Sequence, residues 1–170
     1  AIGLAIVMVF MIIMYAVPGI AASLALAIYT TLVIATLYLF EITLTLPGIA
    51  GIILGIGMAV DANVIVFARV REEIATGKSV QTSMKIGFQK AMSAILDGNI
   101  TTLIASVVLM ALGSGTVKGF AYTLMIGIIL SLFTAMVVTR YILYSLYALG
   151  LKSEKLYGRA KERKSIDFIG

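Results

Sequence analysis

Long apolar runs separated by short polar or helix-breaking segments dominate this chain. A membrane-spanning helix needs about 20 mainly apolar residues. Charged residues and helix breakers divide the chain into roughly five runs of about that length. These runs cover residues 1–17, 20–40, 48–67, 98–113 and 119–148. The pattern therefore predicts an all-α membrane protein, a polytopic bundle of about five transmembrane helices.

A polar stretch, residues 68–97, separates the third run from the fourth. Within it Gly77 can end one helix, and the hydroxyl of Ser79 can cap the next. Apolar residues then recur at helical spacing, at Val80, Met84, Phe88, Met92 and Ile95. We expect an amphipathic helix that packs against the membrane surface or the floor of the bundle, in preference to one that binds a partner.

Composition and charge place this bundle in a membrane with a defined orientation. Hydrophobic residues make up 61% of the chain and charged residues 12%, whereas soluble domains average about 25% charged residues. Most basic residues lie in 68–97 and in a tail at 150–170. Lys and Arg accumulate in short cytoplasmic loops. We therefore expect a multi-pass protein of the cell membrane with a cytoplasmic C-terminus, and no nucleic-acid partner despite the net charge of +5.

The same topology divides the chain into a helix bundle, 1–149, and a basic tail, 150–170. Counting spans back from the cytoplasmic stretch 68–97 places Ala1 on the outer side. A chain that begins there, apolar and without an initiator Met, is expected to be a fragment that lacks an amino-terminal part.

Residue types that are missing exclude several kinds of chemistry. Neither Cys nor His occurs, which removes thiol nucleophiles, imidazole bases and the usual zinc ligands. The sequence also shows no nucleophile beside a base and no phosphate-binding loop. We therefore expect no enzyme, no cofactor and no metal, and proton chemistry falls to carboxylates.

Asp61 is the lone carboxylate in the third apolar run. A charged Asp at the centre of a membrane helix costs roughly 2.5 to 3.5 kcal/mol, and such residues usually lie on ion or proton pathways. Because removal from water disfavours the charged form, we expect Asp61 to gain and lose a proton near physiological pH. The alternative is a structural Asp that bonds a neighbouring helix or interfacial water.

Polar residues at a comparable depth are candidates for the surroundings of Asp61. They are Asn63 on the same run and Asn99, Thr101 and Thr102 at the start of the fourth. The alternative for the threonines is a hydrogen bond to their own helix backbone. Asp97, followed by Gly98, is expected to be an ordinary cap or turn.

Small residues line one side of the third run. Gly51 and Gly55 form a GxxxG pattern, which lets helix backbones approach closely. Tight helix packing is enough to explain both. Gly57 lies about one turn before Asp61 and would leave room beside the carboxylate for water or for a partner.

Two strings carry more information than the pattern: GIAGIILGIGMAVDANVIVFARVREEIATGKS and GFQKAMSAILDGNITTLIASVVLMALGSGTVKGFAYTLMIGIILSLFTAMVVTR. Over about Leu44 to Arg140 the chain closely resembles the SecD branch of the SecD/SecF protein-export family, within the resistance, nodulation and division superfamily. In that family the Asp of the VDAN motif is a proton-pathway residue. The resemblance places that residue at Asp61.

The resemblance also implies a purpose and a set of partners. SecD and SecF, with six helices each, would use proton flow to help unfolded exported polypeptides outward after the SecYEG translocon and SecA have begun translocation across the lipid bilayer. The family's first helix, its large external domain and its SecF proton-pathway residues are absent from this sequence. The final SIDFIG, residues 165–170, resembles the start of SecF and suggests a fused SecDF parent.

Two other functions stay open on the residues alone. One is a proton-coupled small-molecule exporter of the same superfamily, in which Asp61 serves a different substrate. The other is a passive assembly subunit, in which the glycines dock a partner and Asp61 is structural.

Overall fold

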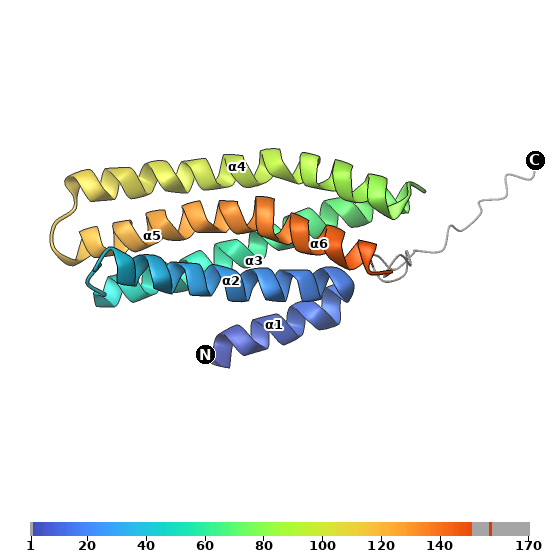
Figure 1. Ribbon diagram of the computed structural model, residues 1–170. Coiled ribbons are helices and arrows are strands. Elements are labelled where there is room, and N and C mark those ends of the chain that lie inside the picture. The colour runs from blue at the N-terminus through green and yellow to red at the C-terminus, as the bar shows by residue number, and fades with distance from the viewer. Residues whose placement is uncertain (1, 151–156, 158–170) are drawn as a thin grey trace, which may run out of the picture.

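The computed structural model describes residues 2–150 and residue 157, and nearly all of them form helices (Figure 1). The helices are α1 (Ile2–Tyr15), α2 (Val17–Leu39), α3 (Leu46–Ala75), α4 (Val80–Leu112), α5 (Thr116–Phe133), a π-helical turn η1 (Thr134–Val138) and α6 (Thr139–Ala148). The described residues contain no strand. The predicted all-α fold class is confirmed.

The helices form an antiparallel bundle with the connections at its two ends. α2, α3, α4 and the continuous α5–η1–α6 rod run side by side, and α1 folds back along α2 (Figure 1). The α2–α3 and α4–α5 turns lie at one end, and the α1–α2 and α3–α4 turns lie at the other (Figure 1). We call the second end the basic end, because Arg69, Arg71, Lys78, Lys85 and Lys90 lie on the elements that meet there.

Four helical segments are long and apolar enough to cross a membrane: α2, α3, α4 and Thr116–Ala148. α1 is apolar but has only 14 residues. At 1.5 Å per residue it is about 21 Å long, against a hydrocarbon core of about 30 Å. Among the described residues the predicted count of about five spans is therefore not confirmed.

α4 differs from the prediction because it is a single helix. The expected amphipathic helix and the fourth apolar run join in Val80–Leu112, and α3 extends to Ala75. Only residues 76–79 of the stretch 68–97 are not helical. The expected cap or turn at Asp97 is wrong, because its carbonyl accepts a hydrogen bond from the Thr101 hydroxyl within α4. A glycine inside a helix costs only about 1 kcal/mol, so Gly98 does not break α4.

The first half of α4 packs on α3. Val80, Met84, Phe88 and Ile95 from the predicted stripe are buried. Gly87 lies so close to α3 that a Cβ there would come within 2.7 Å of the Val70 backbone nitrogen. The apolar face of this segment is therefore covered by the protein itself. This matches the expected packing against the bundle and not packing against the membrane surface.

Local sequence signals set the helix starts. The Ser79 side chain accepts a hydrogen bond from the Thr82 amide at the start of α4. Thr45 does the same for the Gly48 amide at the start of α3, where Pro47 occupies the first turn. Proline suits this position because its missing N–H would be unpaired there in any case.

Candidate functional site

Asp61 lies on α3 with its side chain exposed on the surface of the described chain. It lines a hollow of about 200 Å³ between α3 and α4. The other lining residues are Met58, Ala62 and Ile65 of α3 and Ala94, Ile95, Gly98, Asn99 and Thr102 of α4. The carboxylate therefore faces out of the bundle, toward whatever covers this groove in the membrane.

Two of the four predicted neighbours share this hollow with Asp61. Asn99 and Thr102 line it, and Thr101 and Asn63 do not. Asn99 donates its amide N–H to the Ile95 carbonyl at 2.7 Å, and the Thr102 hydroxyl donates to the Gly98 carbonyl at 3.2 Å. Thr101 likewise bonds its own helix. The alternative of backbone bonding therefore holds for both threonines.

The carboxylate of Asp61 has no hydrogen bond or ion pair within residues 2–150 or with residue 157. Asn99 and Thr102 each donate one hydrogen bond to a carbonyl of α4. Both side chains keep an acceptor oxygen, and Asn99 also keeps its second amide N–H. A protonated Asp61 can donate to such an oxygen, whereas the anion accepts only.

Asn63 lies on the other side of α3. Two residues along an α-helix are about 200° apart around its axis, and Asn63 is 3% exposed. Its Oδ1 accepts a hydrogen bond of 2.7 Å from the Thr139 hydroxyl, directly after the π-helical turn. Asn63 thus joins α3 to α6 inside the bundle. It does not line the hollow around Asp61, where the sequence predicted it.

The predicted glycines fall into two groups. At Gly51 a Cβ would collide with the Thr123 hydroxyl of α5, and at Gly55 it would lie 2.5 Å from the Tyr29 hydroxyl of α2. These two glycines lie where α3 meets its neighbours inside the bundle. Gly57 has no heavy atom within 4 Å of such a Cβ, and neither has Gly98 across the hollow. Asp61 is therefore flanked by two glycines on an open face.

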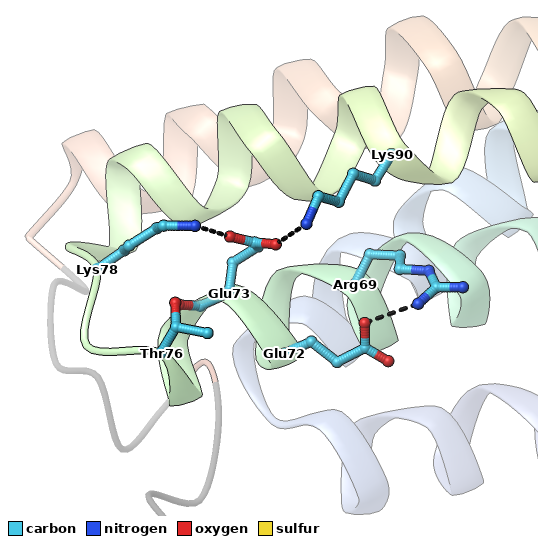
Figure 2. A network of polar contacts seen from close by, with 6 residues as sticks. All are labelled: Arg69, Glu72, Glu73, Thr76, Lys78 and Lys90. Carbon is cyan, nitrogen blue, oxygen red and sulfur yellow. Dashed lines mark hydrogen bonds and ion pairs between the residues drawn. The ribbon is translucent and has the colours of Figure 1, made fainter.

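Sequence reasoning missed a buried carboxylate at the basic end. Glu73 forms ion pairs with Lys78 and Lys90, and its side chain is 5% exposed (Figure 2). Hydrogen bonds from Lys78 and Lys90 hold the pKa of Glu73 below its usual value. The nearby pair of Arg69 and Glu72, at 2.8 Å, is exposed. Glu73 joins the end of α3 to the start of α4, and an acid between basic residues was its only sequence signal.

Comparison with known proteins agrees with this architecture. A family profile described as protein export membrane protein SecD/SecF, C-terminal, matches residues 1–148. The chain belongs to the SecD/SecF family. It is 52% identical over 146 residues to the protein translocase subunit SecD of Acidaminococcus fermentans, covering 86% of this chain and 35% of that protein. The SecD of Synechocystis is 54% identical over 142 residues, or 84% of this chain and 30% of that protein.

Solved structures of this family share the fold. The crystal structure of SecDF, a translocon-associated membrane protein from Thermus thermophilus, superposes with a TM-score of 0.84 at 37% identity, covering 88% of this chain and 21% of that one. SecDF in its super-membrane-facing form gives a TM-score of 0.83 at 37% identity, covering 86% and 20%. The chain spans about a third of the length of the SecD relatives and about a fifth of the SecDF chains.

The predicted resemblance to the membrane part at the C-terminus of SecD is confirmed, and four apolar helices together with the SecD relatives indicate a multi-pass membrane protein. Most of the predicted basic tail, 150–170, lies outside the described residues, as does the SIDFIG segment at 165–170. The suggestion of a fused SecDF parent and the side of the membrane that holds the C-terminus stay predictions.

Proposed function

We propose that this chain is the membrane part of a Sec-type protein-export subunit, in which Asp61 carries protons within a helix bundle shared with SecF. One observation carries the proposal: Asp61 lies in a membrane-spanning helix, faces outward, and has no partner among the described residues. An intramembrane acid is costly unless it is used or paired. Water or a partner subunit must therefore complete its surroundings.

Protonation would bias two states of the bundle. The neutral acid can donate to the oxygen of Asn99 or Thr102 and lets α3 pack closely against a covering helix. The anion needs more donors than the one remaining N–H of Asn99, so it draws in water or a positively charged group from the partner. Alternation between these forms shifts the population of two packings. An external domain would convert this shift into movement of an exported polypeptide.

The open face around Asp61 suits a helix of SecF. Gly57 and Gly98 leave space on either side of the carboxylate, and close backbone approach at small residues stabilises helix pairs in membranes. Leu54, an exposed apolar residue about two helical turns before Asp61, extends this face along α3. The SecYEG translocon with SecA and unfolded exported polypeptides are further partners of this proposed machine.

The proposed orientation follows from charge. Lys and Arg cluster at the basic end, and short loops rich in these residues stay in the cytoplasm. This places the α3–α4 turn and the C-terminus on the cytoplasmic side. Asp61 lies eight residues before Arg69 on the same helix, about 12 Å along its axis. We therefore place Asp61 in the cytoplasmic half of the membrane.

The test replaces Asp61 by Asn in the full-length protein and measures export of a preprotein into inverted membrane vesicles with and without a proton gradient. We expect Asp61→Asn to remove the stimulation by the gradient while the protein still inserts into the membrane. Glu41→Gln is the matched control, because it makes the same change on an exposed turn at the opposite end of the bundle. Full stimulation with Asp61→Asn would favour the passive assembly subunit and overturn the proposal.

A further inference from the structure

A second hollow lies on a different side of the bundle, near the basic end. It measures about 280 Å³ and is lined by Lys85, Phe88, Gln89 and Met92 of α4 and by Arg140 of α6. None of these residues lines the hollow around Asp61. The two sites are therefore separate, and this one plays no part in the proposed proton transfer.

The two cations of this hollow have no acid partner among the residues that the structure describes. Lys78 and Lys90 pair with Glu73, and Arg69 pairs with Glu72 (Figure 2). Lys85 and Arg140, in contrast, form no ion pair with any described carboxylate. The Arg140 guanidinium instead lies 5.8 Å from the centre of the Tyr144 ring. Two like charges that line one hollow repel each other, and an anion between them would relieve that repulsion.

Apart from Gln89, the remaining residues of this hollow are apolar, and an apolar surface continues beyond Arg140. Phe88 is buried and Met92 half-buried beneath the two cations. Arg140 also lines a neighbouring hollow of about 380 Å³ together with Val137, Tyr141 and Tyr144. Val137 and Tyr141 are exposed. A ligand that joins a negative head to an apolar chain would match both hollows, whereas a small soluble anion would use only the first.

The position along the helices fits the level of lipid phosphates. Arg140 lies eight residues before Ala148, where α6 ends, which is about 12 Å along the helix axis. Lys85 lies five residues after the start of α4 at Val80. Long basic side chains at such positions reach toward the membrane–water interface while their stems stay among apolar groups.

We propose that this groove between α4 and α6 binds the phosphate of an anionic phospholipid, such as phosphatidylglycerol. Arg140 offers a planar pair of N–H donors to the phosphate oxygens, and Lys85 adds a compact charge. The amide of Gln89 supplies a further donor to the headgroup. One acyl chain lies along Val137 and Tyr141. A bound lipid bridges α4 and α6 and stabilises the bundle by an amount that rises with the logarithm of its concentration once the site is mostly filled.

The test uses the full-length protein and native mass spectrometry with phosphatidylglycerol or phosphatidylcholine. We expect phosphatidylglycerol to be retained more strongly. A basic residue near an anionic surface is worth about 1 kcal/mol, or roughly fivefold in affinity. The double variant Lys85→Gln/Arg140→Gln should therefore bind phosphatidylglycerol about 10- to 30-fold more weakly. The control Arg69→Gln/Lys118→Gln removes the same charge elsewhere and should change binding by less than about twofold.

A second variant keeps the test decisive if the double variant fails to fold. Gln89→Glu leaves both cations in place and puts a negative charge into the hollow, so it should also weaken retention of phosphatidylglycerol. Inorganic phosphate at matched concentration should compete poorly, because it lacks the acyl chain. Equal retention of the two lipids, unchanged binding by both variants, or full displacement by inorganic phosphate would each overturn the proposal.

Discussion

Asp61 and Asn63 are two residues apart on α3, and the turn of the helix gives them opposite surroundings. Asp61 faces a hollow that opens away from the bundle. Asn63 faces inward and accepts a hydrogen bond from Thr139. The hydrogen bond between Thr139 and Asn63 therefore joins α3 to α6, whereas the hollow beside Asp61 lies between α3 and α4.

This division predicts a stabilising role for the bond between Asn63 and Thr139. Thr139→Val removes the donor and leaves the Asn63 amide oxygen buried without it. Bonds of this kind between membrane helices contribute about 0.6 kcal/mol on average, and up to about 1.7. We expect Thr139→Val to lower the free energy of unfolding of the full-length protein in detergent by an amount in that range. The double variant Asn63→Leu/Thr139→Val should recover part of this loss.

Thr30→Val is the matched control, because the Thr30 hydroxyl bonds only the Leu26 carbonyl of its own helix. Strictly additive effects of Asn63→Leu and Thr139→Val would show that the two side chains do not interact. Membrane insertion of each variant checks that the comparison concerns folded protein.

How far the sequence could predict the site depends on distance along the chain. The free-energy cost of Asp61 in the membrane could be predicted from its immediate neighbours, because it follows from the presence of one acid in an apolar run. The partner of Asn63 is 76 residues away, and nothing near either residue marks the pairing. All four polar neighbours were predicted from depth, but depth does not fix direction around a helix, so that argument did not separate Asn99 and Thr102, which line the hollow, from Thr101 and Asn63, which do not.

Among the elements, the α3–α4 hairpin departs most from the sequence prediction. The sequence predicted the apolar runs and the capping residue Ser79. The predicted boundary at residue 98 does not exist, because α4 continues through Asp97 and Gly98 although these two residues resemble a turn in the sequence. Hydropathy marks the part of a helix that lies in lipid, and here the helix itself extends well beyond that part.

Glu73 gives this hairpin a defined dependence on pH. Its pKa is lower in the folded protein than the ordinary value of 4.5, because Lys78 and Lys90 stabilise the anion. Stabilisation by these ion pairs is therefore complete above about pH 4.5 and is lost as the pH falls toward the folded-state value. We expect Glu73→Gln to unfold more easily than the native protein at neutral pH, by a difference that shrinks below about pH 4.5.

Thermal unfolding between about pH 3 and pH 7, which extends from below the ordinary Glu value to neutral pH, measures that difference. Glu72→Gln is the control, because the pair of Glu72 with Arg69 is exposed and such pairs contribute little. A difference between Glu73→Gln and the native protein that stays constant over the whole range would mean that these ion pairs do not stabilise the fold.

At the scale of the whole molecule, glycine positions separate contacts within the chain from a surface for a partner. Gly51 and Gly55 lie against α5 and α2, and Gly57 and Gly98 face open space. The GxxxG spacing of Gly51 and Gly55 and the place of Gly57 one turn before Asp61 predicted this division, whereas no pattern near Gly98 marked it as facing open space. If the open face of α3 and α4 docks a helix of SecF, bulk at Gly57 or Gly98 should affect assembly and leave the fold of this chain intact.

We therefore expect Gly57→Leu and Gly98→Leu each to weaken association with the partner subunit by about tenfold or more, or ~1.4 kcal/mol, with little change in unfolding of the chain alone. Gly55→Leu should instead destabilise the chain, because its side chain would meet the Tyr29 hydroxyl. Ala35→Leu, on an exposed position of α2, controls for added bulk facing the membrane. Co-purification and unfolding of the same four variants measure both effects. Normal association of Gly57→Leu and Gly98→Leu would place the partner on another face and leave Asp61 facing lipid or water.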